Sequence, residues 1–373
     1  MTAALVPEYI ARGIAAVETP DPAWLARAAE HQQRLTMPPG SLGRLLLIGR
    51  QLAAIQRTER PVGQPALVAV FAADHGVAAA GVSAYPSKVT AQMVANYLRG
   101  GAAVNVLSRR VGASVRVVDL GVASEIDVPV GGSLESRPIR RGTSNFLEGP
   151  AMTLEEAYGA VQVGLELAER WAGTEGFRVI ALGEMGIGNT TSAAVLAAAL
   201  TGSAPHLVVG RGTGLDNRGL ERKRAVVARA LQIHGGADVD IWDLMARVGG
   251  FEILGLAGLA IGAARARALV VVDGLISSVA ALLALRLCPR IEGSLLAAHV
   301  GTEPGHRLVL EYIGLTALFD LDLRLGEGTG AALALPLIAA AADILRDMAT
   351  FESAGVSGPN AQQEKASSEA GER

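Results

Sequence analysis

From about residue 65 onward, the chain alternates short apolar runs with longer segments of helical periodicity, and this alternation restricts its fold most. Each run is apolar on successive positions, as expected for strands buried on both faces. Alternating strands and helices imply a mostly parallel sheet with right-handed crossovers. The sequence therefore predicts an α/β fold with a mostly parallel six-stranded sheet and flanking helices. The expected strands are Ala66–Phe71, Ser114–Leu120, Arg178–Leu182, His206–Val209, Ala268–Val272 and Ser294–Ala298.

Helical patterns lie between several of these runs and at both ends of the chain. We expect residues 1–60 and 328–355 to form a small helical domain and residues 61–327 to form a large α/β catalytic domain. The polar segment 356–373 is expected to be a disordered tail, and residues 122–150, which lack a helical pattern, are expected to form a hairpin. The expected internal helices are Ser87–Arg110, Thr190–Leu200, Gly219–Ile233, Phe251–Ala268 and Gly274–Leu287.

Composition narrows the class of protein. Half of the residues are hydrophobic and only 18% are charged, so most of the chain should be packed, while a net charge of −3 argues against a large nucleic-acid footprint. The single cysteine, Cys288, fits a reducing compartment. Charged residues such as Arg265 and Asp273 interrupt the most apolar stretch, so no run reaches the roughly 20 residues of a membrane span. We expect a cytoplasmic protein with no membrane or nucleic-acid partner.

Polar and glycine residues follow the expected strands at the point where each strand ends. In a mostly parallel sheet these carboxyl ends share one edge, and ligands bind beyond that edge. A single edge that gathers polar residues is what a functional site needs. The segments concerned are Asp74–Gly76, Asp119–Gly121, Gly183–Gly186, Gly210–Gly214, Asp273–Gly274 and His299.

The strongest local motif is Gly183–Thr191, which lies between an expected strand and an alanine-rich helix. Its glycines allow close approach of a ligand, Asn189 or Thr190 can cap the helix, and the helix N-terminus favours a phosphate. The motif lacks the Gly-Lys-Ser/Thr ending of a P-loop and the Gly-x-Gly-x-x-Gly pattern of dinucleotide sites, which disfavours a dehydrogenase. The alternative is a glycine-rich turn that only connects strand and helix.

Two further motifs carry charged candidates. Gly210–Gly214 together with Lys223 can form an anion clamp, but Lys223 also lies in the charged run Glu221–Arg224, which is typical of a solvated helix face. Glu327 stands between two glycines in Arg324–Gly330, immediately before a helical pattern. Apolar walls would raise the pKa of its carboxyl group and make it a competent general base. The alternative is that Glu327 caps the following helix.

Three histidines, His75, His299 and His306, are candidate metal ligands by residue type. No His-x-x-x-His spacing or cysteine pair supports a metal site, and one cysteine is too few for a structural zinc site. We therefore expect hydrogen-bonded structural histidines and no metal.

Taken together, these motifs resemble the nicotinate-nucleotide:dimethylbenzimidazole phosphoribosyltransferases of cobalamin biosynthesis, over about residues 35–355. The resemblance implies a Rossmann-like sheet with a small helical domain built from both chain ends, a homodimer, and no metal or organic cofactor. The matching segments are Pro38–Arg44, Ala73–Val77, Gly142–Thr143, Pro150–Thr153, Gly183–Thr191, Gly210–Gly214 with Lys223, Asp273–Gly274, Glu303–His306 and Arg324–Gly330.

The resemblance also implies a reaction, namely transfer of the 5-phosphoribosyl group of nicotinate mononucleotide to 5,6-dimethylbenzimidazole or a related base. Glu327 then deprotonates the base, and Glu184 is a second carboxylate beside the site. The alternative is a nucleotide-binding regulatory protein without turnover, and the sequence does not identify the preferred base. The implied phosphate and ribose contacts are Gly186, Gly188, Asn189, Thr190, Gly212, Gly214 and Lys223, and the implied base pocket is Ser83, Met185 and Leu325.

The chain departs from the family pattern in three places. Met37 stands where a lysine often precedes Pro-Pro-Gly-Ser, and Leu46 stands where a glutamate is frequent. Val300–Thr302 replaces a serine-containing run. The contact to phosphate or ribose that such a serine offers is therefore open at Gly301.

Overall fold

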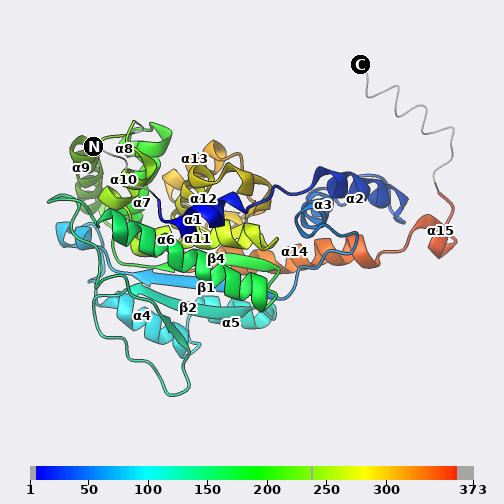
Figure 1. Ribbon diagram of the computed structural model, residues 1–373, viewed down its shortest axis with the longest axis horizontal. Helices are drawn as coiled ribbons and strands as arrows, with labels where there is room; N and C mark the ends of the chain where they lie inside the picture. Colours follow the sequence, from blue (N-terminus) through cyan, green and yellow to red (C-terminus); the bar gives the residue numbers. More distant parts are fainter. Residues whose placement is uncertain (1–5, 237, 359–373) are drawn as a thin grey trace. The chain divides into compact units, whose positions relative to one another are not determined.

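The computed structural model describes residues 6–236 and 238–358, which contain a six-stranded parallel sheet (Figure 1). Its strand order is β3-β2-β1-β4-β5-β6, so the predicted α/β fold class is confirmed. Parallel pairing brings the carboxyl ends of all six strands to one edge. The strands are β1 (Ala66–Ala73), β2 (Ser114–Gly121), β3 (Leu134–Ser136), β4 (Val179–Met185), β5 (Leu269–Val272) and β6 (Leu295–Ala297), with a separate parallel pair β7 (His299–Val300) and β8 (Phe319–Asp320).

The sixth strand is not the expected one. His206–Val209 was predicted to be a strand, but the structure has the short helix α8 (Pro205–Val208) there. A four-residue apolar run does not distinguish strand from helix by periodicity, and Pro205 at the first helical position favours the helix. The edge strand β3 comes instead from residues 122–150, where Leu134 pairs in parallel with Val117. The hairpin predicted for that segment was wrong.

Helices cover both faces of the sheet. Helices α4 and α5 lie on one side of the central strands, and α6, α11 and α12 lie on the other (Figure 1). The helix expected over Ser87–Arg110 is two helices, α4 and α5, because Gly100 adopts a left-handed φ of 74° between them. The helices are α1 (Glu8–Ala15), α2 (Pro22–Arg34), α3 (Arg44–Gln56), α4 (Val89–Leu98), α5 (Ala103–Arg110), α6 (Leu154–Ala168), α7 (Asn189–Thr201), α8, α9 (Asn217–His234), α10 (Ile241–Val248), α11 (Phe251–Arg265), α12 (Leu275–Leu287), α13 (Pro304–Tyr312), α14 (Thr329–Asp347) and α15 (Phe351–Ala354), with 3-10 turns at Gly76–Ala80 and Pro289–Ser294 and a π-helical turn at Glu169–Thr174.

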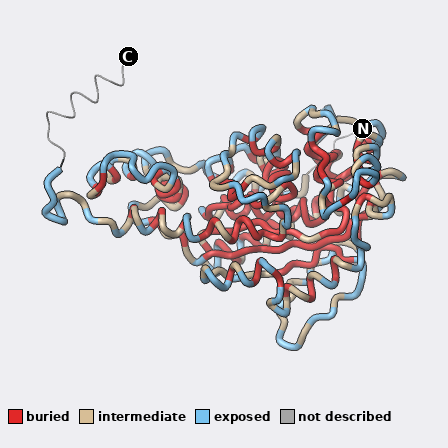
Figure 2. The backbone as a smooth tube through the Cα atoms, turned by 180° about the vertical axis from the view of Figure 1, so that it is seen from behind, coloured by how far each residue is buried: buried red, intermediate tan, exposed pale blue. Residues whose placement is uncertain are grey.

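The core is centred on β1, β4 and β5 and on the helices that pack against them. Every residue of β1 and β5 is buried, as is nearly every residue of α11 (Figure 2). Strands with both faces covered read as continuous apolar runs, which is why their positions were predictable. Helices α6 and α11 approach closely because glycines such as Gly164 and Gly258 meet the backbone of the facing helix.

The described chain divides into two compact units. The larger contains residues 6–19 and 64–336, and the smaller contains residues 20–63 and 337–358. Within the smaller unit, Leu35 forms an antiparallel bridge with Thr350, which joins segments from the two ends of the chain.

The predicted domain boundaries differ from this division most at two places. Helix α1 and the first turns of α14 belong to the larger unit, whereas residues 1–60 and 328–355 were assigned to the helical domain. Helix α1 joins the larger unit because Ile10 is wholly buried and the carbonyl of Ile14 accepts a hydrogen bond from Arg290 at 2.7 Å. The domain assignment stays a prediction. The predicted disordered tail lies largely outside the described residues, which end at residue 358.

One helix in the described part of the chain, α14, is long and apolar enough to cross a membrane by length and composition. Of its most apolar window, 56% is buried inside the protein. An apolar helix that buries most of this surface against protein is accounted for by packing in a core.

The close approach of α6 and α11 generates a stability prediction. A Cβ atom at Gly164 would collide with the carbonyl oxygen of Gly255, so Gly164→Ala should lower the free energy of unfolding by about 1–3 kcal/mol. At Gly159, on the same helix, a Cβ atom would meet only the side chain of Ile139 at 3.4 Å. Gly159→Ala should therefore be neutral or stabilise by up to about 1 kcal/mol. Urea unfolding of both variants measures the difference, and equal effects would contradict the close crossing.

Candidate active site

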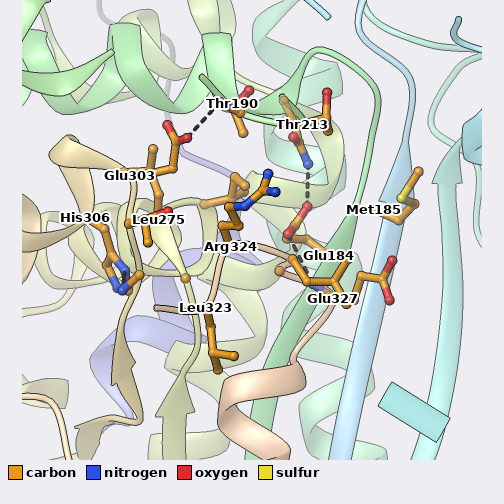
Figure 3. A pocket seen from close by; sticks show the side chains of 18 of the residues that line it. Glu184, Met185, Thr190, Thr213, Leu275, Glu303, His306, Leu323, Arg324 and Glu327 are labelled. Carbon is orange, nitrogen blue, oxygen red and sulfur yellow. Dashed lines mark hydrogen bonds between the residues drawn. The ribbon is translucent and has the colours of Figure 1, made fainter. Parts of the chain in front are cut away.

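An open cavity lies beyond the carboxyl ends of β4 and β5, within the larger unit (Figure 3). It encloses about 710 Å³ of empty space, including the solvent at its mouth. The segments after β4 and β5 and residues 323–327 supply most of its wall. Eight of the predicted site residues line it: Glu184, Met185, Gly186, Asn189, Thr190, Gly212, Leu325 and Glu327.

Four predicted site residues do not line this cavity: Ser83, Gly188, Gly214 and Lys223. Gly188 is the residue before α7, with φ of 100°, and a Cβ atom there would lie 3.2 Å from the Cβ of His75. Its glycine is thus required by the backbone turn. The hydroxyl oxygen of Ser83 accepts a hydrogen bond from the backbone N–H of Tyr85 at 3.2 Å.

The loop that carries Glu327 is held by Asp273, at the end of β5. Gly326, Glu327 and Gly328 all have positive φ, at 79°, 63° and 85°, and glutamate rarely adopts this conformation. The carboxylate of Asp273 accepts hydrogen bonds from the backbone N–H groups of Gly328 at 3.0 Å and Ala331 at 2.8 Å. Asp273 therefore caps the first turn of α14. Capping of that helix does not explain Glu327.

The carboxyl group of Glu327 is only slightly exposed, at 6% for the residue. Burial raises its pKa, the charge of Asp273 raises it further, and the neighbouring hydroxyl of Tyr97 opposes the rise. A carboxyl group whose pKa is raised toward neutrality is suited to accept a proton. Tyr97 comes from α4 and is 2% exposed. In the sequence, Tyr97 stands out only as an aromatic residue on an expected helix, so its place in the site was not predicted.

Glu184 supports the same loop from β4. Its Oε1 accepts a hydrogen bond from the backbone N–H of Glu327 at 3.4 Å, and its Oε2 accepts one from the side-chain amide of Asn189. Burial, with a further contribution from the charge of Glu252, raises the pKa of Glu184 to about 8. Glu184 is therefore mostly protonated at neutral pH. A protonated carboxyl group is a poor base, so Glu327 is the better candidate of the two.

A buried polar network lies under the glycine loop that follows β4. Nε2 of His75 and Oε1 of Glu252 are 2.6 Å apart, and both side chains are essentially inaccessible to solvent. A Cβ atom at Gly186 would lie 3.1 Å from Oε1 of Glu252, so the loop rests directly on this pair. The hydroxyl of Thr90 donates to Asp74 at 2.7 Å and accepts from the backbone N–H of Ile187 at 3.2 Å. His75 is thus a hydrogen-bonded structural histidine, as predicted.

The buried side chain of Lys223 lies at the start of α7. Nζ of Lys223 donates a hydrogen bond to the hydroxyl of Thr190 at 2.8 Å, and Lys223 is only 1% exposed. The solvated-face alternative for Lys223 is therefore wrong. Burial lowers the pKa of Lys223 to about 8, against the opposing charge of Glu303. The backbone N–H of Gly212 donates to Glu303 at 2.7 Å, and that of Gly214 donates to the carbonyl of Arg211 at 3.1 Å.

His299 and His306 both line the cavity, with ring centroids 5.4 Å apart. Nε2 of His299 lies 3.4 Å from Oδ1 of Asp273. Burial opposes protonation of His299, but the hydrogen bond and charge of Asp273 outweigh it and raise its pKa. Across the residues that the structure describes, no group of three or more His, Cys, Asp or Glu side chains is arranged to hold a metal ion.

Comparison with known proteins decides the family. The model of a family described as phosphoribosyltransferase matches residues 17–356 of this chain. The chain belongs to this phosphoribosyltransferase family. The resemblance inferred from the motifs is thereby confirmed, and the substrates of such enzymes are small molecules.

Relatives within the phosphoribosyltransferase family are similar over nearly the whole chain. A nicotinate-nucleotide–dimethylbenzimidazole phosphoribosyltransferase of Halalkalibacterium halodurans is 49% identical over 88% of this chain and 91% of its own. The Pseudomonas aeruginosa enzyme of the same name is also 49% identical, over 90% and 95% respectively. The crystal structure of such an enzyme from Thermus thermophilus matches with a TM-score of 0.85 and 47% identity, and the match covers 91% of this chain and all of that one.

The placement of Tyr97 generates a prediction for the titration of Glu327. Because the phenol favours the ionised carboxylate, Tyr97→Phe should raise the pKa of Glu327 above its wild-type value. Carbon-13 NMR titration of glutamate-labelled protein measures this shift. Tyr158, whose ring packs against Trp242, is the control, and Tyr158→Phe should leave the titration of Glu327 unchanged. A Glu327 pKa that stays constant or falls in Tyr97→Phe would show that the phenol does not act on this carboxyl group.

Proposed function

We propose that this protein transfers the 5-phosphoribosyl group of nicotinate mononucleotide to 5,6-dimethylbenzimidazole or a related base, releasing nicotinate and α-ribazole 5′-phosphate. The names of relatives about 49% identical over most of the chain support this activity. The observation that carries it is the position of Glu327. Glu327 lines the cavity, the pKa of its carboxyl group is raised, and the helix α14 is capped by Asp273 instead.

In the proposed reaction, one benzimidazole nitrogen forms a bond to C1′ of the ribosyl phosphate as the bond from C1′ to nicotinate breaks. Neutral benzimidazole carries one N–H and one lone pair. Glu327 takes the N–H proton as the other nitrogen attacks, so a full positive charge does not build up on the ring. Protonated Glu184 remains a hydrogen-bonded support of the loop that bears Glu327.

The phosphate of the nucleotide is proposed to bind at the start of α7. The helix dipole, the hydroxyl of Thr190 and the ammonium group of Lys223 all favour an anion there. Because the backbone N–H groups of Gly212 and Gly214 already have acceptors, their contacts to phosphate require that these bonds exchange. Fixing the phosphate orients C1′ toward the attacking base.

The base pocket is proposed to lie beside Glu327, between Met185 and Leu325, both of which line the cavity. Such side chains suit a flat aromatic base. Ser83 is retained only as a contact that the family resemblance implies. A homodimer is likewise part of the proposal, supported by that resemblance, and a cytoplasmic location is supported by the free, buried Cys288.

The activity is tested by incubating the protein with nicotinate mononucleotide and a panel of benzimidazoles, purines and phenols. Mass spectrometry should detect nicotinate together with the ribosylated base. Binding of the nucleotide without release of nicotinate for any base would favour a regulatory protein instead.

Glu327→Gln tests the proposed base. The amide keeps the size of the side chain but does not accept a proton, so turnover should fall about 10²–10⁴-fold with little change in substrate binding. Because the base acts when ionised, the wild-type rate should fall as the pH falls through the raised pKa of Glu327. That acidic limb should be absent in Glu327→Gln. A folded variant within threefold of the wild-type rate would exclude Glu327 as the base and direct attention to Glu184.

Lys223 gives a separate pH prediction. Its amino group carries a positive charge below its pKa of about 8, and this charge is lost as the pH rises above that value. Wild-type affinity for nicotinate mononucleotide should therefore decrease above about pH 8, and Lys223→Met should bind weakly with no such dependence. The control Arg224→Met, which removes an ion pair with Glu221 on the same helix, should retain the wild-type profile. Calorimetry between pH 6.5 and 9.5 measures the nucleotide affinity of all three proteins. If this affinity changed with pH in the same way in wild type and Lys223→Met, Lys223 would not be part of the phosphate site.

A further inference from the structure

His306, on the first turn of α13, has a fixed tautomer. The residue is wholly buried, yet it lines the cavity (Figure 3). Its Nδ1 accepts a hydrogen bond from the backbone N–H of Gly301 at 2.8 Å. A ring nitrogen that accepts such a bond carries no proton, so the proton of the neutral ring is on Nε2. Nε2 of His306 is therefore a hydrogen-bond donor.

The ring stays neutral over the physiological range. Burial, with a smaller contribution from the neighbouring His299, lowers the pKa of His306 to about 4. The charge of Arg307 acts in the same direction, and the charge of Asp273 opposes it. The donor form is thus the populated form, and it adds no charge to the cavity.

This donor has no hydrogen-bond partner within the part of the chain that the structure describes. Buried polar atoms without partners are rare in native proteins, and on a residue that lines a cavity a ligand atom can supply the missing partner. Oε2 of Glu303 is in the same condition but is an acceptor. The two residues are three positions apart at the start of α13, and both line the cavity.

The surroundings of His306 select which part of a substrate it meets. Figure 3 shows Glu303 and His306 on one side of the cavity, and Met185 and Glu327 on the other, where the accepting base must bind. The cation suited to a phosphate is Lys223, which hydrogen-bonds Thr190 at the start of α7, so the phosphate is already provided for there. Hydroxyl groups both donate and accept hydrogen bonds, so they suit this pair of side chains.

We propose that Nε2–H of His306 donates a hydrogen bond to a ribose hydroxyl oxygen of nicotinate mononucleotide. The assignment rests on the proposed function for the identity of the nucleotide. It makes His306 a substrate-binding residue that acts on the sugar and not on the accepting base.

Two substitutions separate the roles of the ring. His306→Asn keeps an acceptor where Nδ1 stands, so the bond from Gly301 is retained, but it has no donor at the position of Nε2. It should fold like the wild type and raise the Kd for nicotinate mononucleotide about 3- to 10-fold, as expected for one lost neutral hydrogen bond. His306→Gln reaches the Nε2 position with its amide and loses the inner acceptor. It should melt at a lower temperature but bind the nucleotide within twofold of wild type.

Calorimetry and thermal melting of the two variants, with nicotinate riboside as a second ligand, test the assignment. The riboside lacks the phosphate, so His306→Asn should lose affinity for it by the same factor. An unchanged riboside affinity would move the contact to the phosphate and overturn the proposal. If His306→Asn bound the nucleotide with the same Kd as the wild type, His306 would have only a structural role, and this result would also overturn the proposal. His234→Asn is the control, because it removes a buried hydrogen bond to the carbonyl of Phe146 and should lower only the melting temperature.

These outcomes are independent of turnover. A wild-type protein that binds the nucleotide but releases no nicotinate with any base would contradict the proposed function, while the binding differences at His306 would still support the sugar contact. In active wild type, His306→Asn should raise KM for the nucleotide and leave KM for the base unchanged. An equal rise in both constants would count against a sugar contact.

Discussion

The two hydrogen bonds that Asp273 accepts from the first turn of α14 join the end of β5 to the loop that bears Glu327. That loop is pressed onto the sheet, since a Cβ atom at Gly183 would lie 2.6 Å from the carbonyl oxygen of Glu327. A glutamate with positive φ persists only where its surroundings determine the backbone. The capping by Asp273 and the contact with β4 supply that determination. The position of the proposed base thus depends on two strands and on the start of one helix.

Several buried acids share this edge of the sheet, and each is accommodated differently. Asp273 accepts two backbone N–H bonds and lies beside His299, and Glu252 pairs with His75. Glu184 retains its proton near neutral pH, because its pKa is raised to about 8. If Glu184 were ionised, its charge would oppose ionisation of Glu327 nearby. Holding Glu184 neutral therefore makes it easier for Glu327 to become the carboxylate that a base must be.

The sequence allowed most of the sheet and one side of the site to be predicted. Strands β1, β4 and β5 are buried on both faces and produce continuous apolar runs, so their carboxyl ends located Glu184 and Asp273. Strand β3 has three residues, none of them buried, and leaves no such run. Tyr97 needed the structure, because its surroundings come from distant segments, and Lys223 was predicted with a solvated helix face left open as the alternative. A charged run on a helix does not reveal that one lysine of that run turns into the protein.

Gly301 and His306 depend on each other through a close approach and a hydrogen bond. A Cβ atom at Gly301 would lie 3.0 Å from Nδ1 of His306 and 3.1 Å from the carbonyl oxygen of Leu323. A side chain at 301 would therefore press on the buried ring and disturb the hydrogen bond that fixes its tautomer. The two positions are coupled, since the ring needs the glycine. A serine at 301 would press on the ring of His306 as well as bring a hydroxyl, so the effect of such a side chain depends on whether the residue at 306 can give way.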